Sequence, residues 1–248
     1  MRYLITFSYD GTRYKGFQKQ TKGKAKTIQS EIESVLFKIN SNKEVSISAT
    51  GRTDAGVHAL NQKAHFDLEK EIDINRLKDS LNQMLPEDIY IKKVEVVADD
   101  FHARYDVKAK EYIYKINMGE YNPIERNYVY QYNKRLNIAE MERALKYLEG
   151  EHNFKSLTKA TPEIKDYNRT IIQASLIRNV KNINEITISV VGTGFLRYMV
   201  RNIVGLLIEI GEGKRKSEEV YSILKEEDRE ASGPTAPACG LYLKEIYY

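Results

Sequence analysis

Hydrophobic residues recur along the chain with two periodicities, one typical of strands and one typical of helices. Over residues 3–9 they alternate with polar residues, which places Ile5 and Phe7 on one face of a predicted strand. Over residues 28–39 they recur every three or four positions, which predicts a helix with Thr27 as its N-cap. The chain is therefore expected to mix strands and helices.

The same periodicities continue to the end of the chain. Further strands are predicted at residues 45–50, 62–68, 89–97, 108–118, 170–180, 185–191 and 240–246, and further helices at residues 73–84, 137–149, 196–210 and 217–227. The strand at 108–118 places Lys110, Tyr112, Tyr114 and Ile116 on one face. Because the second half repeats the order of the first, we predict an α+β protein of two similar halves. These halves are residues 1–104 and 105–248, with a cleft between them.

The composition is that of an ordinary globular protein, with 42% hydrophobic and 30% charged residues among 248. The longest apolar stretch, residues 203–210, is interrupted by Gly205 and Glu209 and is too short to span a membrane. The first residues lead directly into a strand and lack the apolar core of a signal peptide. The sequence therefore predicts a cytoplasmic protein that does not insert into a membrane.

Few residues are suited to holding a metal or a cofactor. Cys239 is the single cysteine, which excludes an internal disulfide and a cysteine-based metal cluster. His58 and His65 straddle a loop and a strand without a neighbouring carboxylate cluster, and His102 and His152 stand alone. The sequence also lacks a phosphate-binding or dinucleotide-binding glycine loop. No metal and no cofactor are expected.

Positive charge is concentrated in one loop. The net charge is only +4, which by itself says little about partners. Residues 11–26, however, carry six cations and no acid, namely Arg13, Lys15, Lys19, Lys22, Lys24 and Lys26. With glycines at positions 11, 16 and 23, this loop is interpreted as a strap that holds an RNA backbone. The alternative is an ordinary solvated lysine loop.

The most informative segment reads Gly-Arg-Thr-Asp-Ala-Gly-Val-His-Ala over residues 51–59. Glycines on both sides of an Arg-Thr-Asp step allow the backbone to bend sharply and to hold Asp54 out of a sheet. A carboxylate in such a place can attack a sugar carbon as a nucleophile. Arg52 can contact phosphate or fill the space of a displaced base. The alternative is a tight turn in which Asp54 caps backbone amides.

Together with residues 51–59, several other strings resemble the tRNA pseudouridine synthase A family. They are Tyr9-Asp10-Gly11-Thr12, Gly16-Phe17-Gln18, Phe101-His102-Ala103-Arg104, Arg169-Thr170-Ile171, Met199-Val200-Arg201-Asn202-Ile203-Val204-Gly205, Gly233-Pro234-Thr235-Ala236-Pro237-Ala238 and Gly240-Leu241-Tyr242-Leu243. They follow the family's order over nearly the whole chain, and the strings at 51–59 and 199–205 are highly specific. The chain departs from the pattern in a longer, more basic loop at 21–26 and in a looser segment at 152–157.

The resemblance implies a fold and a substrate. The fold is the pseudouridine synthase fold, in which two ferredoxin-like halves with mainly antiparallel sheets and packed helices flank an active-site cleft. The reaction is the isomerisation of uridine to pseudouridine at positions 38–40 of the tRNA anticodon arm. The family further implies a homodimer that works without a metal.

The resemblance also implies roles for individual residues. Asp54 matches the catalytic aspartate, Arg201 matches the basic residue that pairs with it, and Arg52 matches the arginine that helps to displace the target base. Tyr112 matches the tyrosine that packs on the uracil and is a candidate base. The apolar pocket residue matches Leu241 or Leu243. Independently of the resemblance, His58 is interpreted as a structural or RNA-contacting histidine and is a candidate for substrate binding.

Three alternatives remain open from the sequence. Asp54 either attacks C1′ of the ribose or assists elimination to a glycal. The enzyme acts either on the anticodon arm or on another RNA, because shape and loop contacts decide RNA specificity. A catalytically silent RNA-binding relative is the alternative from another functional class, and the intact Asp54, Tyr112 and Arg201 argue against it.

Overall fold

The computed structural model describes residues 1–20, 25–162 and 164–248. It divides into two compact units: Met1–Lys108 with Tyr242–Tyr248 form unit 1, and Ala109–Leu241 form unit 2. The halves expected from the sequence were 1–104 and 105–248. The last strand accounts for the main difference, because its residues pair with a strand of unit 1. Lys22, Gly23 and Lys24 of the predicted strap lie outside the described residues.

Unit 1 has a ferredoxin-like order of strands and helices. Its elements are β1 (Arg2–Tyr9), α1 (Ile28–Ile39), β2 (Ser48–Ala49), β3 (His58–Asp67), α2 (Ile74–Met84) and β4 (Ile89–Val97). The strand order is β4-β1-β3 with antiparallel neighbours, and β2 pairs antiparallel with β3. The last strand, β10 (Leu241–Tyr247), runs parallel to β3, with Tyr242 opposite His58 and Leu243 opposite Ala59.

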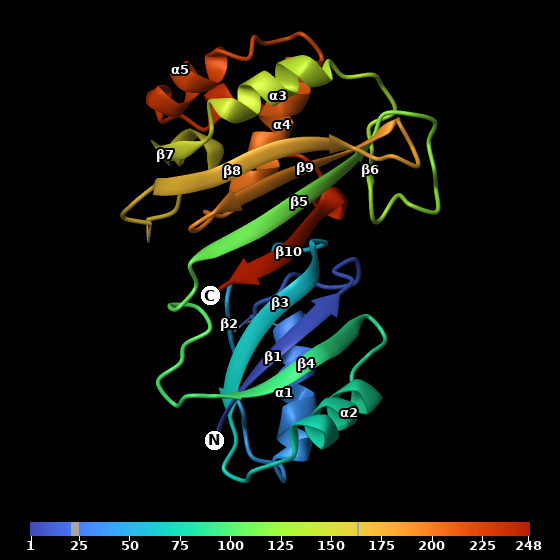
Figure 1. Ribbon diagram of the computed structural model, residues 1–248, viewed down its shortest axis with the longest axis vertical. Coiled ribbons are helices and arrows are strands. Elements are labelled where there is room, and N and C mark those ends of the chain that lie inside the picture. Colours follow the sequence, from blue (N-terminus) through green and yellow to red (C-terminus); the bar gives the residue numbers. More distant parts are fainter. Residues whose placement is uncertain (21–24, 163) are drawn as a thin grey trace. The chain divides into compact units, whose positions relative to one another are not determined.

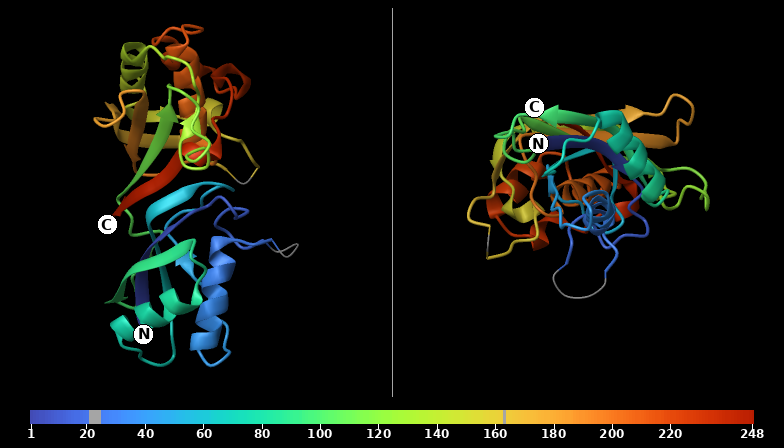
Figure 2. Two further views of the ribbon diagram at one scale, coloured as in Figure 1. Left: turned by 90° about the vertical axis from the view of Figure 1, so that its right-hand side faces the viewer. Right: turned by 90° about the horizontal axis from the view of Figure 1, so that it is seen from below.

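The core of unit 1 contains apolar residues from both predicted patterns, the alternating strand pattern and the helical pattern. Alternate residues of β1, including Ile5 and Phe7, are fully buried, as are Ile32 and Leu36 on the apolar stripe of α1. Figures 1 and 2 show α1 along one face of this sheet. The burial confirms the faces predicted for both elements.

Unit 2 also alternates strands with helices, with three strands between its first two helices. Its elements are β5 (Ala109–Asn117), β6 (Tyr130–Gln131), α3 (Ile138–Lys146), β7 (Gly150–Asn153), β8 (Asn168–Arg178), β9 (Glu185–Gly192), α4 (Met199–Gly211) and α5 (Glu219–Glu226), with short 3-10 turns at Lys155–Leu157, Glu230–Ser232 and Ala238–Gly240. The strand order is β5-β9-β8-β7 with antiparallel neighbours, and β6 pairs parallel with β5. The predicted α+β class with mainly antiparallel sheets is confirmed.

The α4 helix is the centre of unit 2. Nearly all of its side chains are buried, and it contacts α3, which in turn contacts β8 (Figure 1). A helix that is apolar on all sides belongs in the interior of a protein. Within the described parts of the chain, no helix is both long enough and apolar enough to cross a membrane.

Local chemistry explains where the predicted elements differ from the observed ones. The strand expected at 45–50 is reduced to β2, at Ser48–Ala49. The helix expected from residue 196 begins at Met199, because Tyr198 has a φ of 64° and cannot continue a right-handed helix. The polar strand β7 was not predicted, since Gly-Glu-His-Asn has no alternating apolar residues.

We expect replacement of Thr27 by alanine to destabilise unit 1 by about 1 kcal/mol. Thr27 Oγ1 accepts a hydrogen bond from Ser30 N, and Ser30 Oγ accepts one from Thr27 N, so both donors at the start of α1 are satisfied. The change is read as the midpoint of chemical unfolding. Ser34→Ala, at an exposed position of α1, is the matched control and should not lower the midpoint. Equal midpoints for the two variants would contradict the cap.

Candidate active site

The loop that carries Asp54 is tied to β3 at its start. Thr50 donates through its N and its Oγ1 to the carbonyl of Lys63, and Gln62 Nε2 donates to the carbonyl of Gly51 at 2.9 Å. Further along, Val57 N donates to Asp54 O at 3.2 Å, which closes a tight turn. The loop thus joins two ordered strands without being a packed strand itself.

Within this loop the side chains differ in exposure. Gly56 has a φ of 76°, which confirms the sharp bend predicted there. Thr53 is buried, Asp54 is half-buried and Arg52 is exposed. The bend therefore presents an arginine and a carboxylate at the surface of unit 1 while their neighbour Thr53 points inward.

A second loop, residues 10–17, lies directly against the Asp54 loop. A Cβ atom at Gly11 would lie 2.0 Å from the carbonyl oxygen of Val57, and one at Gly16 would lie 2.9 Å from that of Thr53. Phe17 N donates to the same Thr53 oxygen at 3.0 Å. Backbone contacts this close exclude any side chain at Gly11, which explains why this position is a glycine.

Tyr9, the last residue of β1, holds the middle of the Asp54 loop. Its hydroxyl shares a hydrogen bond of 2.7 Å with Thr53 Oγ1, and its ring is 4% exposed. Burial raises the pKa of Tyr9 to about 12, so the hydroxyl stays protonated at neutral pH. Tyr9 therefore fixes the residue that precedes Asp54 from the core side.

His58 is surrounded by the same two loops. Its ring is 2% exposed and stacks on Tyr242 with the ring centroids 4.7 Å apart. Its Nδ1 lies 3.1 Å from Gly11 N and 3.1 Å from Asp10 Oδ1. An unprotonated Nδ1 accepts from Gly11, whereas a protonated Nδ1 donates to Asp10. The predicted RNA contact of His58 stays a prediction, and the burial favours the supporting role.

In unit 2, Tyr112 lies in the middle of β5. It is 8% exposed, stands opposite Val190 of β9, and meets the ring of Phe195 edge to face at a centroid distance of 5.0 Å. Phe195 in turn lies over Gly192, where a Cβ would come within 3.1 Å of its ring. This packing fixes the plane of the Tyr112 ring.

Arg201 lies in the first turn of α4 and is held by a loop that runs over the helix. Its Nε donates to the carbonyl of Ala236 at 2.7 Å, and Ala236 N donates to the Arg201 carbonyl at 3.1 Å. The loop reaches the helix because Gly205 has no side chain, since a Cβ there would lie 1.7 Å from the oxygen of Pro234. Both the backbone and the side chain of Arg201 are thus anchored to one residue.

Leu241 and Leu243 lie two positions apart on β10 and share one face of the strand. Leu241 is 5% exposed and Leu243 is fully buried. Leu241 ends unit 2, while Leu243 pairs with Ala59 in unit 1.

The described cations of the predicted strap are partly compensated by acids from other segments. Arg13 pairs with Asp88 at 2.5 Å, and Lys19 Nζ lies 3.4 Å from Glu33. Lys26 is exposed and lies 5.1 Å from the centre of the Tyr14 ring. The loop is therefore less positive than its own sequence indicates, because tertiary neighbours supply the acids that the segment lacks.

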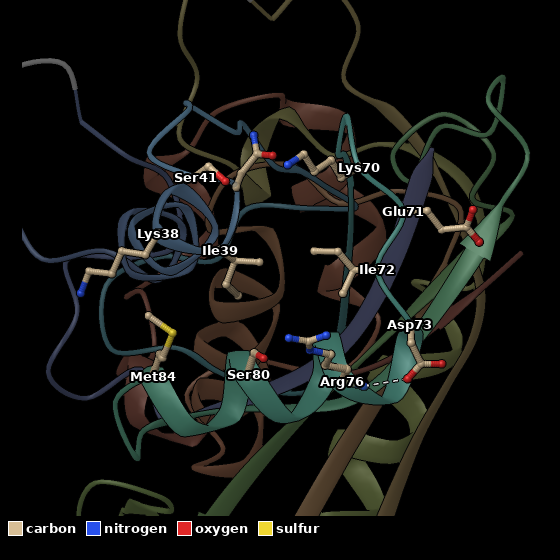
Figure 3. Close-up of a pocket in the computed structure, with 11 residues that line it drawn as sticks. Lys38, Ile39, Ser41, Lys70, Glu71, Ile72, Asp73, Arg76, Ser80 and Met84 are labelled. Carbon is tan, nitrogen blue, oxygen red and sulfur yellow. Dashed lines mark hydrogen bonds between the residues drawn. The ribbon is translucent and has the colours of Figure 1, made fainter.

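The structure offers little to a metal ion. Among residues 1–20, 25–162 and 164–248, no three His, Cys, Asp or Glu residues form a group that could bind one. A hollow of about 470 Å³ lies in unit 1 between the end of α1 and the length of α2 (Figure 3). Its lining mixes both signs of charge, from Lys38, Lys70, Glu71, Asp73 and Arg76, and includes none of the predicted site residues.

Sequence reasoning found the polar side chains of the site but missed those that hold them. Tyr9 and Ala236 were recognised only as parts of family strings, whereas Gly11 and Gly16 were interpreted as glycines of a mobile strap and are instead packed against the Asp54 loop. Their packing depends on approaches between segments that are far apart in the chain. The glycines themselves were the sequence signal that could have indicated such close approaches.

These parts define the class of fold: an α+β protein with antiparallel sheets, in which predicted site residues lie on a braced loop of unit 1 and at the start of a helix of unit 2. A family model described as tRNA pseudouridine synthase matches residues 5–106 and 144–248. The chain belongs to this family of isomerases.

Similar proteins with the name tRNA pseudouridine synthase A span the whole chain. Those of Streptococcus equi subsp. equi (strain 4047) and Streptococcus pneumoniae (strain P1031) are 42% identical over 248 residues, which cover 100% of this chain and 98% of each relative. That of Streptococcus pyogenes serotype M1 is 42% identical over 249 residues, which cover 100% of this chain and 99% of the relative. The resemblance stated from the sequence strings is confirmed.

Among solved structures, a crystal structure of a Cbf5-Nop10-Gar1 complex is similar at a TM-score of 0.34 and 11% identity, over 83% of this chain and 54% of that chain. A similarity this low supports no statement about fold or activity.

We expect Gly11→Ala to lower the thermal unfolding temperature by several degrees, because the new methyl group would lie 2.0 Å from the Val57 carbonyl and force the two loops apart. Overpacking of this kind costs roughly 1–3 kcal/mol. Gly194→Ala is the matched control, since its Cβ would meet only the side chain of Arg169 at 3.5 Å. A Gly11→Ala protein as stable as the Gly194→Ala protein would show that the loops do not pack this closely.

Proposed function

We propose that this enzyme converts uridine to pseudouridine at positions 38–40 of the tRNA anticodon arm, with Asp54 as the nucleophile. The observation that carries the proposal is the setting of Asp54. It is half-buried next to the exposed Arg52, in a loop braced by Tyr9, Gly11 and Gly16. A nucleophile must be held in one place without being sealed off from its substrate, and this loop meets both requirements.

The reaction rearranges bonds within one nucleotide. The target uridine first leaves its stack, which costs a few kcal/mol, and the exposed Arg52 is suited to hold the vacated space. On the first route Asp54 attacks C1′ as the bond between C1′ and N1 breaks, and the Asp54–C1′ bond breaks again when C5 bonds to C1′. On the second route Asp54 removes the C2′ proton as the bond between C1′ and N1 breaks, and it returns that proton to C2′ when C5 bonds to C1′. The freed uracil turns, C5 bonds to C1′, and the C5 proton is lost as N1 gains one. No outside reagent is consumed.

Arg201 and Tyr112 complete the proposed machinery. Arg201 keeps the Asp54 carboxylate ionised against the desolvation of a closed pocket. With its Nε donating to Ala236, it would engage a carboxylate through its terminal nitrogens. Tyr112 offers the uracil an aromatic surface whose plane is set by Phe195, and its hydroxyl is a candidate base for the C5 proton. Leu241, which retains some exposed surface, is assigned to the apolar wall.

The remaining expectations belong to the same proposal. The enzyme works in the cytoplasm as a homodimer, without a metal or a cofactor. Lys26 and the neighbouring lysines of its loop grip the RNA backbone. His58 acts through the Asp54 loop, because its ring is almost fully buried.

Asp54→Asn should abolish pseudouridine formation, because an amide is a far poorer nucleophile than a carboxylate. tRNA should still bind within about tenfold of the unmodified enzyme's affinity, since the variant keeps the size of the side chain. The measurement is pseudouridine mapping of folded tRNA transcripts after incubation with each purified protein.

The controls are the wild-type protein and tRNA transcripts in which the uridines at positions 38–40 are replaced by cytidines. Conversion at positions 38–40, and its loss when these uridines are replaced by cytidines, supports the anticodon-arm target. Conversion elsewhere in the RNA would replace that target with another. Turnover by Asp54→Asn would remove Asp54 from the role of nucleophile, and binding without turnover by the wild type would favour a silent RNA-binding protein.

Arg201→Met and Tyr112→Phe should separate the electrostatic role from the stacking role. Arg201→Met removes the positive charge and should cut kcat by about a hundredfold, with tRNA affinity nearly unchanged. Tyr112→Phe keeps the aromatic face and removes the hydroxyl. It should lose rate if the hydroxyl moves the proton, and keep most of it if stacking is the whole role. Near-normal kcat in both variants would withdraw these two residues from the mechanism.

A further inference from the structure

Tyr198 has an unusual backbone conformation directly beside Arg201. Its φ of 64° and ψ of 0° fall in the left-handed region, which glycine and asparagine adopt readily and which is rare for a bulky residue. Its carbonyl accepts from Asn202 N at 2.9 Å and so begins α4. Strained residues of this kind persist where the surrounding structure holds them, and they concentrate at functional sites.

The conformation of Tyr198 is held from the preceding residue. The carbonyl of Arg197 accepts from Thr158 Oγ1 at 2.7 Å and from Lys159 N at 3.2 Å. These two donors follow the 3-10 turn Lys155–Leu157, so a segment far away in the sequence fixes the chain just before α4. Tyr198 therefore has little freedom to relax into a right-handed conformation.

The result of this geometry is that the Tyr198 ring faces a guanidinium. The central carbon of Arg201 lies 5.2 Å from the ring centroid, and that of Arg197 lies 5.0 Å from it. Both distances are within the range of a cation–π contact.

We propose that Tyr198 is a positioning residue for Arg201, and that its ring holds the guanidinium in place. Arg201 is then held from two sides, by the ring and by the Ala236 carbonyl at its Nε. This inference rests on the proposed function, because it matters only if Arg201 acts in the reaction.

The chemistry of the two contacts suits an arginine whose charge is needed elsewhere. A carboxylate in the place of Tyr198 would also hold Arg201, but it would cancel most of the positive charge. An aromatic face and a backbone carbonyl attract the cation without carrying a formal negative charge. Tyr198 therefore fixes the guanidinium and leaves its charge for the Asp54 carboxylate.

The test compares Tyr198→Phe with Tyr198→Leu. Both variants keep a bulky residue at a positive φ, so the backbone strain is matched, and only phenylalanine keeps the ring. We expect Tyr198→Phe to retain most of kcat and Tyr198→Leu to lose about tenfold, with the KM for tRNA unchanged in both. kcat and KM are measured by steady-state pseudouridine formation over a range of tRNA transcript concentrations, and folding is checked by thermal unfolding.

If the leucine variant folds poorly, Tyr198→Asn tests the loss of the ring instead. Asparagine adopts the left-handed conformation readily and lacks a ring, so it should be at least as stable as the wild type and still lose about tenfold in kcat. A double variant tests whether the ring acts through Arg201. Tyr198→Leu should have no further effect on kcat in an Arg201→Met background.

Three outcomes would overturn the inference. Equal kcat for the phenylalanine and leucine variants would show that the ring is not needed. A raised KM with unchanged kcat would show that Tyr198 contacts the RNA itself, and additive losses in the double variant would show that it acts independently of Arg201. A wild-type protein that makes no pseudouridine in tRNA would overturn the proposed function, whereas active wild type with unaffected ring variants would overturn this inference alone.

Discussion

Backbone segments approach each other at glycine positions in both units more closely than any side chain allows. In unit 1 the contact joins Gly11 to the carbonyl of Val57, and in unit 2 it joins Gly205 to the carbonyl of Pro234. Each contact docks one loop onto the segment that bears a proposed catalytic residue, Asp54 in the first case and Arg201 in the second. Because a Cβ in either place would meet an oxygen at 2.0 Å or less, the loops cannot slide without breaking the packing.

Near these two contacts, neutral groups hold Thr53 and Arg201 in place. Tyr9 shares a hydrogen bond with Thr53, and Arg201 donates to a backbone carbonyl and lies beside an aromatic ring. The surface loop before α1 is different, since Arg13 is paired directly with Asp88. The Arg13 side chain is largely exposed although that of Asp88 is not, and an ion pair at the surface adds little stability. The neutral anchors of Arg201 carry no formal charge that would cancel its own. The neutral anchors suit the catalytic role proposed for Arg201, and the ion pair suits the position of Arg13 in a surface loop.

The proposed chemistry also explains why the site residues differ in burial. Arg52 is exposed, as a residue that meets an RNA strand must be, and Asp54 is half-buried, which limits the water around a nucleophile. Tyr112 and Leu241 are buried, and the proposal assigns to them the aromatic and apolar surfaces on which a displaced base is stable.

The sequence alone determined the α+β class, most of the elements and the family. Strand and helix periods are local properties, and a cap such as Thr27 acts within one turn, so both could be predicted without a structure. Asp54 and Arg201 were found because long specific strings surround them. The tertiary structure decided what holds these residues. That β10 joins β3, that Asp88 compensates Arg13, that Gly205 admits Pro234 and that Tyr198 is left-handed all depend on segments distant in the chain. Contacts of that kind leave no periodic signal in the sequence, because they are set by the packing of whole elements against one another.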